Sequence, residues 1–455
     1  MKLQIIGRTL VARNRRLFGP WLACVLSAGF LYGGDWPVWL GPTGDNSSPE
    51  TGWLKEWPES GPPRLFEKAT GGGYSAVVVA SGRLVLFHRE GDELVVSCLG
   101  ALDGAPAWSF RYPTDYVDRY GYSSGPRCSP LIDLASEPAR VFTLGPKGVL
   151  YALDFATGKK LWRSDLQGDY DLPSNFFGVG AVPLLAGERL YVNLGGTDFD
   201  TGLTFAIDKS TGKVVWKTPS GGGAYAQARL AEIDGEPQLF VFHRTGMSCY
   251  HPESGKEKWR FLWHSRIYDS VNATTPVVAS DLLFFSAAYN TGSTVLRVKK
   301  ESYEVVWQDS RDSRDKALES HWSNVNLVDG YLYGFSGRHQ PEGALSCVEL
   351  ATGKVRWRWR DYLGRGSMLY ADAHFIALGE RGDLALLKLD SEGHEELARV
   401  EDVLGSPAWS PPVLANGLLY LRDERKLVCM DLRVKAPALD SVKSQDAKKA
   451  ASPEH

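Results

Sequence analysis

The sequence predicts an all-β fold, an eight-bladed β-propeller of four-stranded antiparallel blades whose ring is closed by an N-terminal strand. Three observations predict this fold. A strand-turn-strand motif recurs every 41 to 54 residues, most copies end in a tryptophan, and the last copy lacks its final strand. A motif repeated at this spacing is typical of repeat architectures. The copies begin at residues 98, 152, 206, 249, 297, 347, 388 and 429.

One well-formed copy, Ala152-Leu-Asp-Phe-Ala-Thr-Gly-Lys-Lys-Leu-Trp162, shows how each unit is built. Residues 150–153 suit a half-buried strand, and Thr157-Gly158 suits a tight turn because glycine accepts a positive φ. A further strand follows the turn. Two more strand-like runs precede the motif, at residues 128–133 and 139–144. Four short antiparallel strands in each unit make a propeller blade.

The aromatic residue at the end of the motif is predicted to be structural, because a large ring in the fourth strand can fill the space between neighbouring blades. The last blade lacks this strand, since the chain turns polar after Asp431. The isolated strand-like run Arg64–Lys68 precedes the first full blade, and we expect it to complete the eighth blade and remove an open sheet edge. The predicted blade-docking residues are Trp108, Trp162, Trp216, Trp259, Trp307, Trp357 and Phe66.

The repeats assign residues 35–433 to one propeller, although a chain of 455 residues would usually suggest about three domains. Residues 1–34 are predicted to be a signal peptide or an N-terminal anchor, and residues 434–455 a disordered polar tail. The formal net charge of −3 and the lack of a basic stripe with interleaved aromatics argue against nucleic-acid binding. We expect the closed ring to be a monomer.

The N-terminus predicts export to the periplasm or cell envelope. Basic residues precede the apolar stretch 17–32, which is too short to predict a membrane span. An ordinary secretory signal explains this pattern, and Arg15-Arg16-Leu17-Phe18 also resembles a twin-arginine signal. Cys24 follows a sequence that fits a lipoprotein signal poorly. If the segment stayed uncleaved, it would associate the protein peripherally with a membrane.

Copies with Asp154-x-x-Thr157-Gly158-Lys159 and Asp208-x-x-Thr211-Gly212-Lys213 resemble the repeat of the pyrroloquinoline-quinone (PQQ) proteins. The chain from about residue 35 to 433 is similar to PQQ-binding-like β-propeller repeat proteins related to the outer-membrane assembly factor B family. It resembles the quinoprotein alcohol dehydrogenases more distantly. Trp36-Pro-Val-Trp39-Leu-Gly-Pro42 supports the resemblance. The resemblance implies the fold and leaves the activity open, because the repeat itself is structural.

The quinoprotein branch of this resemblance implies PQQ and calcium as cofactors. Its calcium-dependent members carry adjacent cysteines beside the quinone, and a Glu, an Asn and an Asp that hold the metal. This chain has no Cys-Cys pair and no convincing match to the calcium set, so no cofactor is established. Four of its cysteines share one repeat position, which favours small buried residues. The cysteines of the predicted propeller are Cys98, Cys128, Cys249, Cys347 and Cys429.

The candidate site lies at the mouth of the channel, because every loop from an outer strand to the next inner strand ends there. Loops on a rigid scaffold commonly carry function. Each candidate also has a structural interpretation. An arginine can hold a loop by an ion pair with a carboxylate, a histidine can be a hydrogen-bonded structural residue, and acidic loops are mostly solvated. The predicted ligand contacts are Arg127, His321, Trp322, Asn324, Tyr120 and Asn272, and the metal candidates are Asp115, Asp118 and Asp171.

Three functions compete, and we favour the first because a shared fold does not transfer chemistry. The first is a binding or scaffolding propeller of the cell envelope that takes an envelope protein partner. The second is a PQQ- and calcium-dependent oxidoreductase, similar to an alcohol dehydrogenase, with its site at the funnel. The third is a propeller that binds another small ligand or a glycan through aromatic residues. The sequence assigns no catalytic residue.

Overall fold

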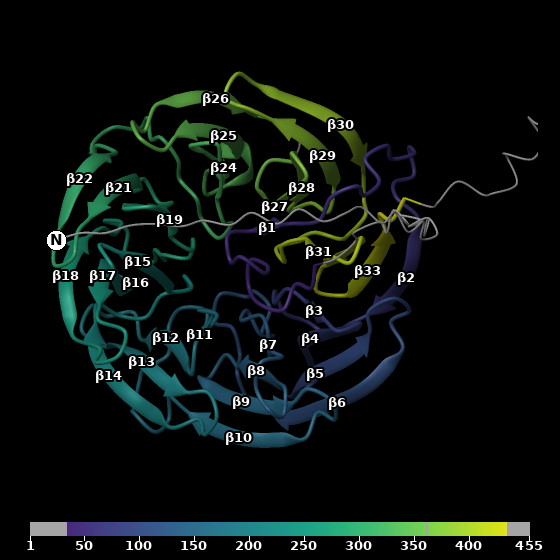
Figure 1. Cartoon of the computed structure of the whole chain (residues 1–455), viewed down its shortest axis with the longest axis horizontal. Helices are drawn as coiled ribbons and strands as arrows, with labels where there is room; N and C mark the ends of the chain where they lie inside the picture. Colours follow the sequence, from purple (N-terminus) through teal and green to yellow (C-terminus); the bar gives the residue numbers. More distant parts are fainter. Residues whose placement is uncertain (1–33, 361–362, 435–455) are drawn as a thin grey trace, which may run out of the picture. The chain divides into compact units, whose positions relative to one another are not determined.

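Eight β-sheets follow one another around a ring in the computed structural model, which describes residues 34–360 and 363–434 (Figure 1). The eight-bladed, four-stranded, antiparallel fold is confirmed. One short 3-10 helix, η1 (Gln340–Glu342), interrupts the strands. Within the described ranges, no helix is long and apolar enough to cross a membrane. The predicted signal segment lies outside these ranges up to residue 33, as does the predicted tail from residue 435.

The first four blades each contribute strands in chain order from the channel outwards. They are β3 (Val78–Ala80), β4 (Arg83–Glu90), β5 (Glu93–Gly100) and β6 (Pro106–Pro113); β7 (Leu131–Asp133), β8 (Arg140–Leu144), β9 (Val149–Asp154) and β10 (Lys160–Asp165); β11 (Leu184–Ala186), β12 (Arg189–Gly195), β13 (Gly202–Asp208) and β14 (Val214–Ser220); and β15 (Arg229–Ile233), β16 (Glu236–His243), β17 (Gly246–Tyr250) and β18 (Glu257–Leu262).

Blades 5 to 8 continue the same order, except that an early segment of the chain completes the last one. They are β19 (Val277–Ala279), β20 (Leu282–Ala287), β21 (Gly292–Val298) and β22 (Tyr303–Gln308); β23 (Asn326–Val328), β24 (Tyr331–Ser336), β25 (Ala344–Glu349) and β26 (Val355–Trp359); β27 (Gly366–Ala371), β28 (His374–Gly379), β29 (Leu384–Leu389) and β30 (His394–Val400); and β31 (Val413–Ala415), β32 (Leu418–Arg422), β33 (Lys426–Asp431) and β2 (Arg64–Ala69).

All eight predicted motif starts fall in the third strand of a blade, which explains why the motif counts the blades. In most blades the first residue of the motif pairs with the aromatic residue of the fourth strand, as Ala152 pairs with Trp162. The prediction was two residues late in two blades, because their third and fourth strands stay paired further, up to Val298 with Tyr303 and Leu389 with His394, before the chain turns. The observed pairs there are Val295 with Trp307 and Leu386 with Ala398, in place of Arg297 and Lys388 as starts.

The tryptophan of one blade packs on the turn glycine of the next. Trp162 covers Gly212, where a Cβ atom would lie 2.4 Å from the indole ring, and Gly212 has a φ of +72°. Glycine is therefore required there for both its shape and its backbone conformation. The Trp162 Nε1 donates a hydrogen bond to the Lys209 carbonyl at 3.1 Å. The same ring-on-glycine contact joins Trp108 to Gly158, Trp216 to Gly255, Trp307 to Gly353 and Phe66 to Gly104.

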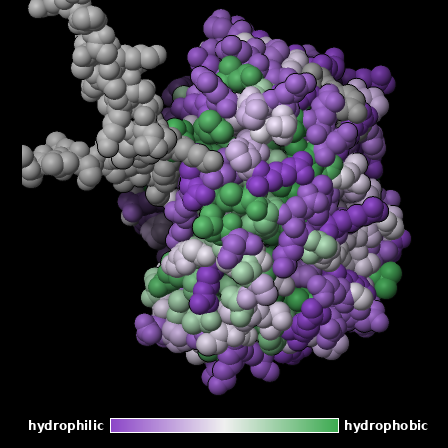
Figure 2. Space-filling view, turned by 90° about the vertical axis from the view of Figure 1, so that its right-hand side faces the viewer, coloured by the Kyte–Doolittle hydropathy of each residue, from purple (hydrophilic) through white to green (hydrophobic). Residues whose placement is uncertain are grey.

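Strand β2 closes the ring. It pairs antiparallel with β33, and Phe66 stands opposite Cys429, the place that tryptophan takes in other blades. Because Phe66 also covers Gly104 of blade 1, the joint between the last and first blades repeats the regular design. Figure 2 shows the side of the ring that carries β2, where hydrophobic groups lie among mainly hydrophilic residues. Leu65 of β2 is 37% exposed there.

The segment from residue 34 to the start of β2 crosses the channel, a feature that the sequence did not reveal (Figure 1). Trp36 exchanges backbone hydrogen bonds with Val79 of β3 in blade 1. Strand β1 (Ser47–Ser48) pairs in parallel with β27 in blade 7. Between them, the Trp39 Nε1 donates to the Thr275 hydroxyl just before blade 5, at 3.4 Å. The segment therefore ties inner strands on different sides of the ring together.

The cysteines behave as core residues. All five in the described ranges are buried and free of disulfides. Cys98 and Cys429, for example, are 0% exposed within the third strands of their blades. Burial raises the pKa of each of their thiols, which keeps them uncharged and unreactive.

Candidate functional site

The loops that lead into the inner strands surround a pocket of about 480 Å³ at one mouth of the channel, which we call the funnel. Aromatic and cationic side chains dominate its lining. Among the lining residues that the structure describes, Asp269 alone is acidic. A pocket of this size suits a small ligand or a few side chains of a partner.

One position of the repeat recurs around the funnel, four residues before the first residue of an inner strand. Tyr74 precedes Val78 in this way in blade 1, and Trp322 precedes Asn326 in blade 6. The equivalent position in blade 7 lies outside the described residues. This register is the signal by which the sequence could have revealed most of the lining. The position holds Tyr74, Arg127, Gly180, Tyr225, Ala273, Trp322 and Trp409 in blades 1 to 6 and 8.

Aromatic rings form a continuous belt around the funnel, from Trp322 before blade 6 to Tyr225 before blade 4. The ring centroids of Trp322 and Trp409 lie 5.9 Å apart, and those of Trp409 and Tyr122 lie 5.5 Å apart. Tyr122 continues to Phe177 at 5.6 Å, and Phe177 to Tyr225 at 5.9 Å. These separations are typical of favourable aromatic pairs. The belt offers flat apolar surfaces to a planar group.

Arg127 is held in place by the protein itself. Its guanidinium donates to the Asp118 carboxylate at 2.9 Å and to the Ser123 carbonyl at 3.3 Å. It also lies 5.4 Å from the ring centroid of Tyr74 and 5.5 Å from that of Phe177. The Asp118 side chain is 0% exposed, so Arg127 is the charge that balances it. Arg127 lines the funnel, and its first role is structural.

His321 belongs to a hydrogen-bonded chain that also reaches Trp409 of the belt through Glu380. Its Nδ1 accepts from Arg365 at 3.3 Å, because a guanidinium can only donate, and its Nε2 lies 2.9 Å from the Tyr289 hydroxyl oxygen. Burial, and then the charge of Arg365, lower the pKa of His321 to about 3. Arg365 and Trp409 both donate to Glu380 Oε2, at 2.6 and 3.0 Å. His321 is therefore a neutral side chain with both nitrogens engaged, which makes it a poor general base.

Two groups at the funnel lack partners. Arg338 stacks on the Tyr289 ring at 4.3 Å and forms no ion pair within the described part of the chain. The Trp322 Nε1 is buried and donates to no protein atom described by the structure. A buried donor left unbonded costs about 1–3 kcal/mol. The Arg338 guanidinium offers unpaired donors to oxygen atoms of a ligand.

Two of the predicted contacts lie elsewhere. Asn272 donates to the His243 carbonyl at 2.9 Å, and Asn324 accepts from the Thr275 backbone nitrogen at 3.0 Å. Both side chains join neighbouring blades and are absent from the funnel lining. The structure brings Arg127, His321 and Trp322 into the funnel, with Tyr120 at its rim, 43% exposed.

The three aspartates predicted as metal ligands do not converge. Asp118 accepts from Arg127 and from the backbone nitrogens of Tyr120 and Tyr122. Asp115 pairs with Lys147 at 2.7 Å, and with Asp171 it lines a separate groove between blades 1 and 2. In the described ranges, no three His, Cys, Asp or Glu side chains are grouped as a metal site. Two of the three carboxylates instead pair with cations of the chain, Asp118 with Arg127 and Asp115 with Lys147.

Sequence comparison supports the resemblance drawn from the motifs. Residues 205–371 match the family described as outer membrane protein assembly factor BamB. The chain is 24% identical over 365 residues to outer membrane protein assembly factor BamB of Yersinia pestis. This match covers 77% of the chain and 85% of the Yersinia pestis protein. The chain is a BamB-like PQQ-repeat β-propeller.

Solved structures agree on the fold. The structure of BamB from Moraxella catarrhalis has a TM-score of 0.57 at 16% identity, and the match covers 82% of this chain and 98% of that one. Quinohemoprotein alcohol dehydrogenase from Comamonas testosteroni has a TM-score of 0.62 at 14% identity, over 90% of this chain and 82% of that one. A protein named as an outer membrane assembly factor and an alcohol dehydrogenase both match this ring, so the fold does not select between their functions.

Proposed function

We propose that this BamB-like propeller is a binding protein of the cell envelope, and that the funnel is its binding site for a flat ring bearing an anionic group. The observation that carries the proposal is the pair of unpartnered donors, Arg338 and the Trp322 Nε1, beside an aromatic belt. The belt suits the ring, and the donors suit an anionic oxygen.

The location in the envelope is part of the same proposal. The basic and apolar residues at positions 1–34 support export, and the similarity to a protein named as an outer membrane assembly factor supports a scaffolding role with an envelope protein partner. The proposed boundaries are a signal peptide or anchor at 1–34, a propeller at 35–433 and a polar tail at 434–455.

A quinoprotein oxidoreductase is the second candidate, and one observation favours part of it. PQQ is a planar ring system with carboxylates, which matches the belt and the arginines of the funnel. The calcium half of the site does not fit, because Asp269 is the single acidic side chain among the lining residues that the structure describes and the sequence has no Cys-Cys pair. We therefore propose PQQ as a ligand that the funnel could hold. We derive no reaction step through it.

The deciding experiment is a titration of the chain from residue 34 with PQQ, with and without calcium, followed by tryptophan fluorescence and quinone absorbance. We expect saturable binding that needs no calcium and that weakens about tenfold in Arg338→Gln, because a charge-assisted hydrogen bond is lost. Arg119→Gln is the matched control, since Arg119 is an exposed mouth-face arginine absent from the funnel lining. No saturation, or equal affinity in Arg338→Gln, would contradict the funnel proposal. Calcium-dependent reduction of a dye with alcohol would favour the oxidoreductase.

A further inference from the structure

Two exposed aromatic residues, Phe199 and Tyr268, stand beside the funnel. Phe199 lies in the loop that joins β12 to β13 and is 50% exposed, and Tyr268 lies in the loop that joins β18 to β19 and is 61% exposed. Loops of these two kinds emerge on the same face of the propeller as the funnel, although neither residue lines it. We call the pair the aromatic platform. Large apolar side chains that are exposed together are typical of recognition surfaces.

A buried arginine holds the platform in place. The Arg244 guanidinium carbon lies 5.5 Å from the ring centroid of Phe199 and 5.6 Å from that of Tyr268. The guanidinium donates to the backbone carbonyls of Thr197, Tyr268 and Ser270, so both loops are tied to one group. Since Arg244 lies over one face of each ring, the opposite faces are left for a ligand.

This support is costly for the protein. Arg244 is 5% exposed and forms no ion pair within the described part of the chain. Burial lowers the pKa of its guanidinium. A charge buried without a counter-ion destabilises a folded chain. Because this charge lies beneath two exposed rings, it indicates that their fixed position matters, as it does where a binding surface is pre-organised.

Polar groups lie at the edge of the platform. The Tyr268 hydroxyl donates to the Asp198 carboxylate at 3.4 Å, so the loop that carries Phe199 also contacts Tyr268 directly. The ring centroid of His264 lies 5.0 Å from that of Phe199. The His264 Nδ1 donates to the Ser265 carbonyl at 2.8 Å, which makes Nε2 an acceptor in the neutral ring. The groups at this edge therefore mainly accept hydrogen bonds.

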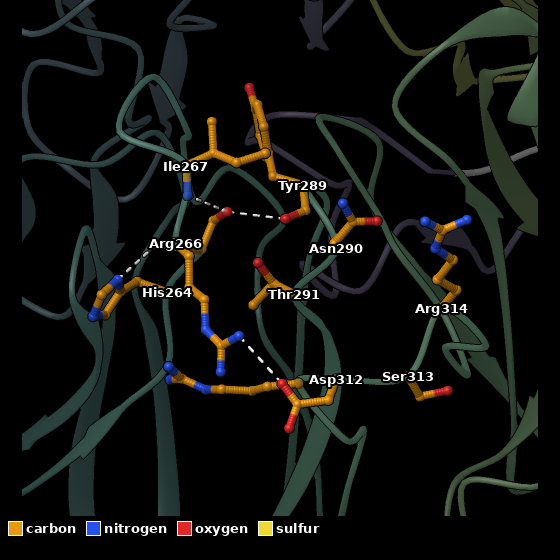
Figure 3. A pocket seen from close by; sticks show the side chains of 11 residues that line it. His264, Arg266, Ile267, Tyr289, Asn290, Thr291, Asp312, Ser313 and Arg314 are labelled. Carbon is orange, nitrogen blue, oxygen red and sulfur yellow. Dashed lines mark hydrogen bonds and ion pairs between the residues drawn. The ribbon is translucent and has the colours of Figure 1, made fainter.

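The charges around the platform favour a neutral ligand. Asp198 and Asp200 are exposed and form no ion pair with any residue that the structure describes, so an anion would be repelled. Arg244 already takes the attraction of the two rings for a cation. Arg266, in the loop of the platform, turns toward Asp312 and pairs with it at 3.2 Å (Figure 3). It therefore adds no unpaired charge.

We propose that the aromatic platform binds a neutral glycan, whose flat C–H faces stack on Phe199 and Tyr268 and whose hydroxyl groups donate to Asp198. A pyranose with equatorial hydroxyls has apolar faces that match aromatic rings, and a hydroxyl binds a carboxylate strongly. The row of rings continues from Tyr268 to Phe176 at 5.9 Å and from Phe176 to Tyr120 at 6.1 Å, and Tyr120 is 43% exposed. The surface therefore suits a chain of sugars better than a single one.

The test is a calorimetric titration of the chain from residue 34 with cellotetraose and, separately, with chitotetraose. We expect saturable binding of at least one of them, weakened about tenfold or more in Phe199→Ala/Tyr268→Ala, because aromatic anchors carry most of the affinity of a binding site. Phe199→Tyr keeps the ring and should bind like the parent. The matched control is Val117→Ala, at an apolar residue 73% exposed in the loop between β6 and β7, which should change the affinity less than about twofold. No saturable binding of either sugar would overturn the proposal.

Two further outcomes separate this glycan site from other sites and ligands. Binding of a neutral sugar should not weaken as the salt concentration rises, whereas binding of a cation should, because salt screens charges. Tetralysine that binds in place of the sugars, and is lost in Asp198→Asn, would overturn the proposal. So would sugar binding that Arg338→Gln abolishes, because the glycan would then lie in the funnel. PQQ binding should be unchanged in Phe199→Ala/Tyr268→Ala, since neither residue lines the funnel.

Discussion

The blade joints at the rim and the funnel at the centre each take one residue from nearly every blade, but with opposite results. At the rim the residue is an aromatic ring on a glycine, as in Trp162 on Gly212, and it repeats with little change. At the funnel the shared position holds residues as different as Gly180, Arg127 and Trp322. Each joint solves the same packing problem, whereas each funnel position faces a different part of one asymmetric pocket.

This difference teaches where to look for function in a repeat protein. A residue that recurs at the same position of each repeat indicates a role in stability. A residue that differs from the others at such a position indicates a role in recognition. The predictions below test this division, beginning with the closure of the ring.

Removal of residues 34–71 should have the largest effect, because it deletes β2 and the segment that crosses the channel. Trp36 and Trp53 lie in that segment and are 3% and 2% exposed. Losing one large buried aromatic costs about 3–5 kcal/mol, and a whole domain is stable by about 5–15 kcal/mol. We expect the cooperative thermal transition to disappear when the chain from residue 72 is compared with the chain from residue 34. A similar midpoint in calorimetry for both chains would contradict ring closure as a source of stability.

Trp162→Ala or Trp216→Ala should destabilise the protein by about 3–5 kcal/mol without weakening funnel binding. The reason is that each indole fills a joint between blades and donates to a carbonyl of the next one. Denaturant unfolding gives the stability, and the PQQ titration gives the binding. A variant as stable as the parent but unable to bind PQQ would show that these residues serve binding and not stability.

Two arginines of the funnel should separate stability from binding. Arg127→Ala leaves the Asp118 side chain, 0% exposed, without its counter-charge, and should cost about 3–5 kcal/mol. Arg338→Gln removes no ion pair. It should change the free energy of unfolding by about 0.5 kcal/mol or less while weakening the binding of the ligand. Denaturant midpoints of the two variants measure this contrast. Equal destabilisation by both would mean that Arg338 is also structural.

A further effect needs no substitution, because the stability itself should depend on pH. Burial lowers the pKa of His243 to about 3, below the ordinary value of about 6.5. As the pH falls, the unfolded chain therefore binds a proton at His243 before the folded chain does. The stability that neutral His243 contributes is complete above about pH 6.5 and is lost as the pH falls toward 3. The loss is about 1.4 kcal/mol for each pH unit. Urea unfolding between pH 7 and pH 4 should show this slope, and His243→Gln should reduce it. His321→Gln should reduce it as well, and this variant alone should also alter funnel binding.

Much of the fold could be predicted because the repeat carries it. The motif counted the blades, and the missing strand after Asp431 predicted the closing role of Arg64–Lys68, which pairs with β33. Of the six predicted funnel contacts, Arg127, His321, Trp322 and Tyr120 do line the pocket, whereas Asn272 and Asn324 bond to the backbone of neighbouring blades. Loop membership alone could not separate these cases, because it does not say which side chains turn inwards.

The sequence by itself determined the architecture, because turn glycines, strand periodicity and a tryptophan in register are local features repeated along the chain. Only the tertiary structure decided what the funnel is. Arg338, Arg365 and Trp409 come from different blades and meet only when the ring closes. Trp39 reaches the same pocket from the segment that crosses the channel. Contacts between residues this far apart depend on the curvature of the whole ring, and no local pattern encodes that curvature.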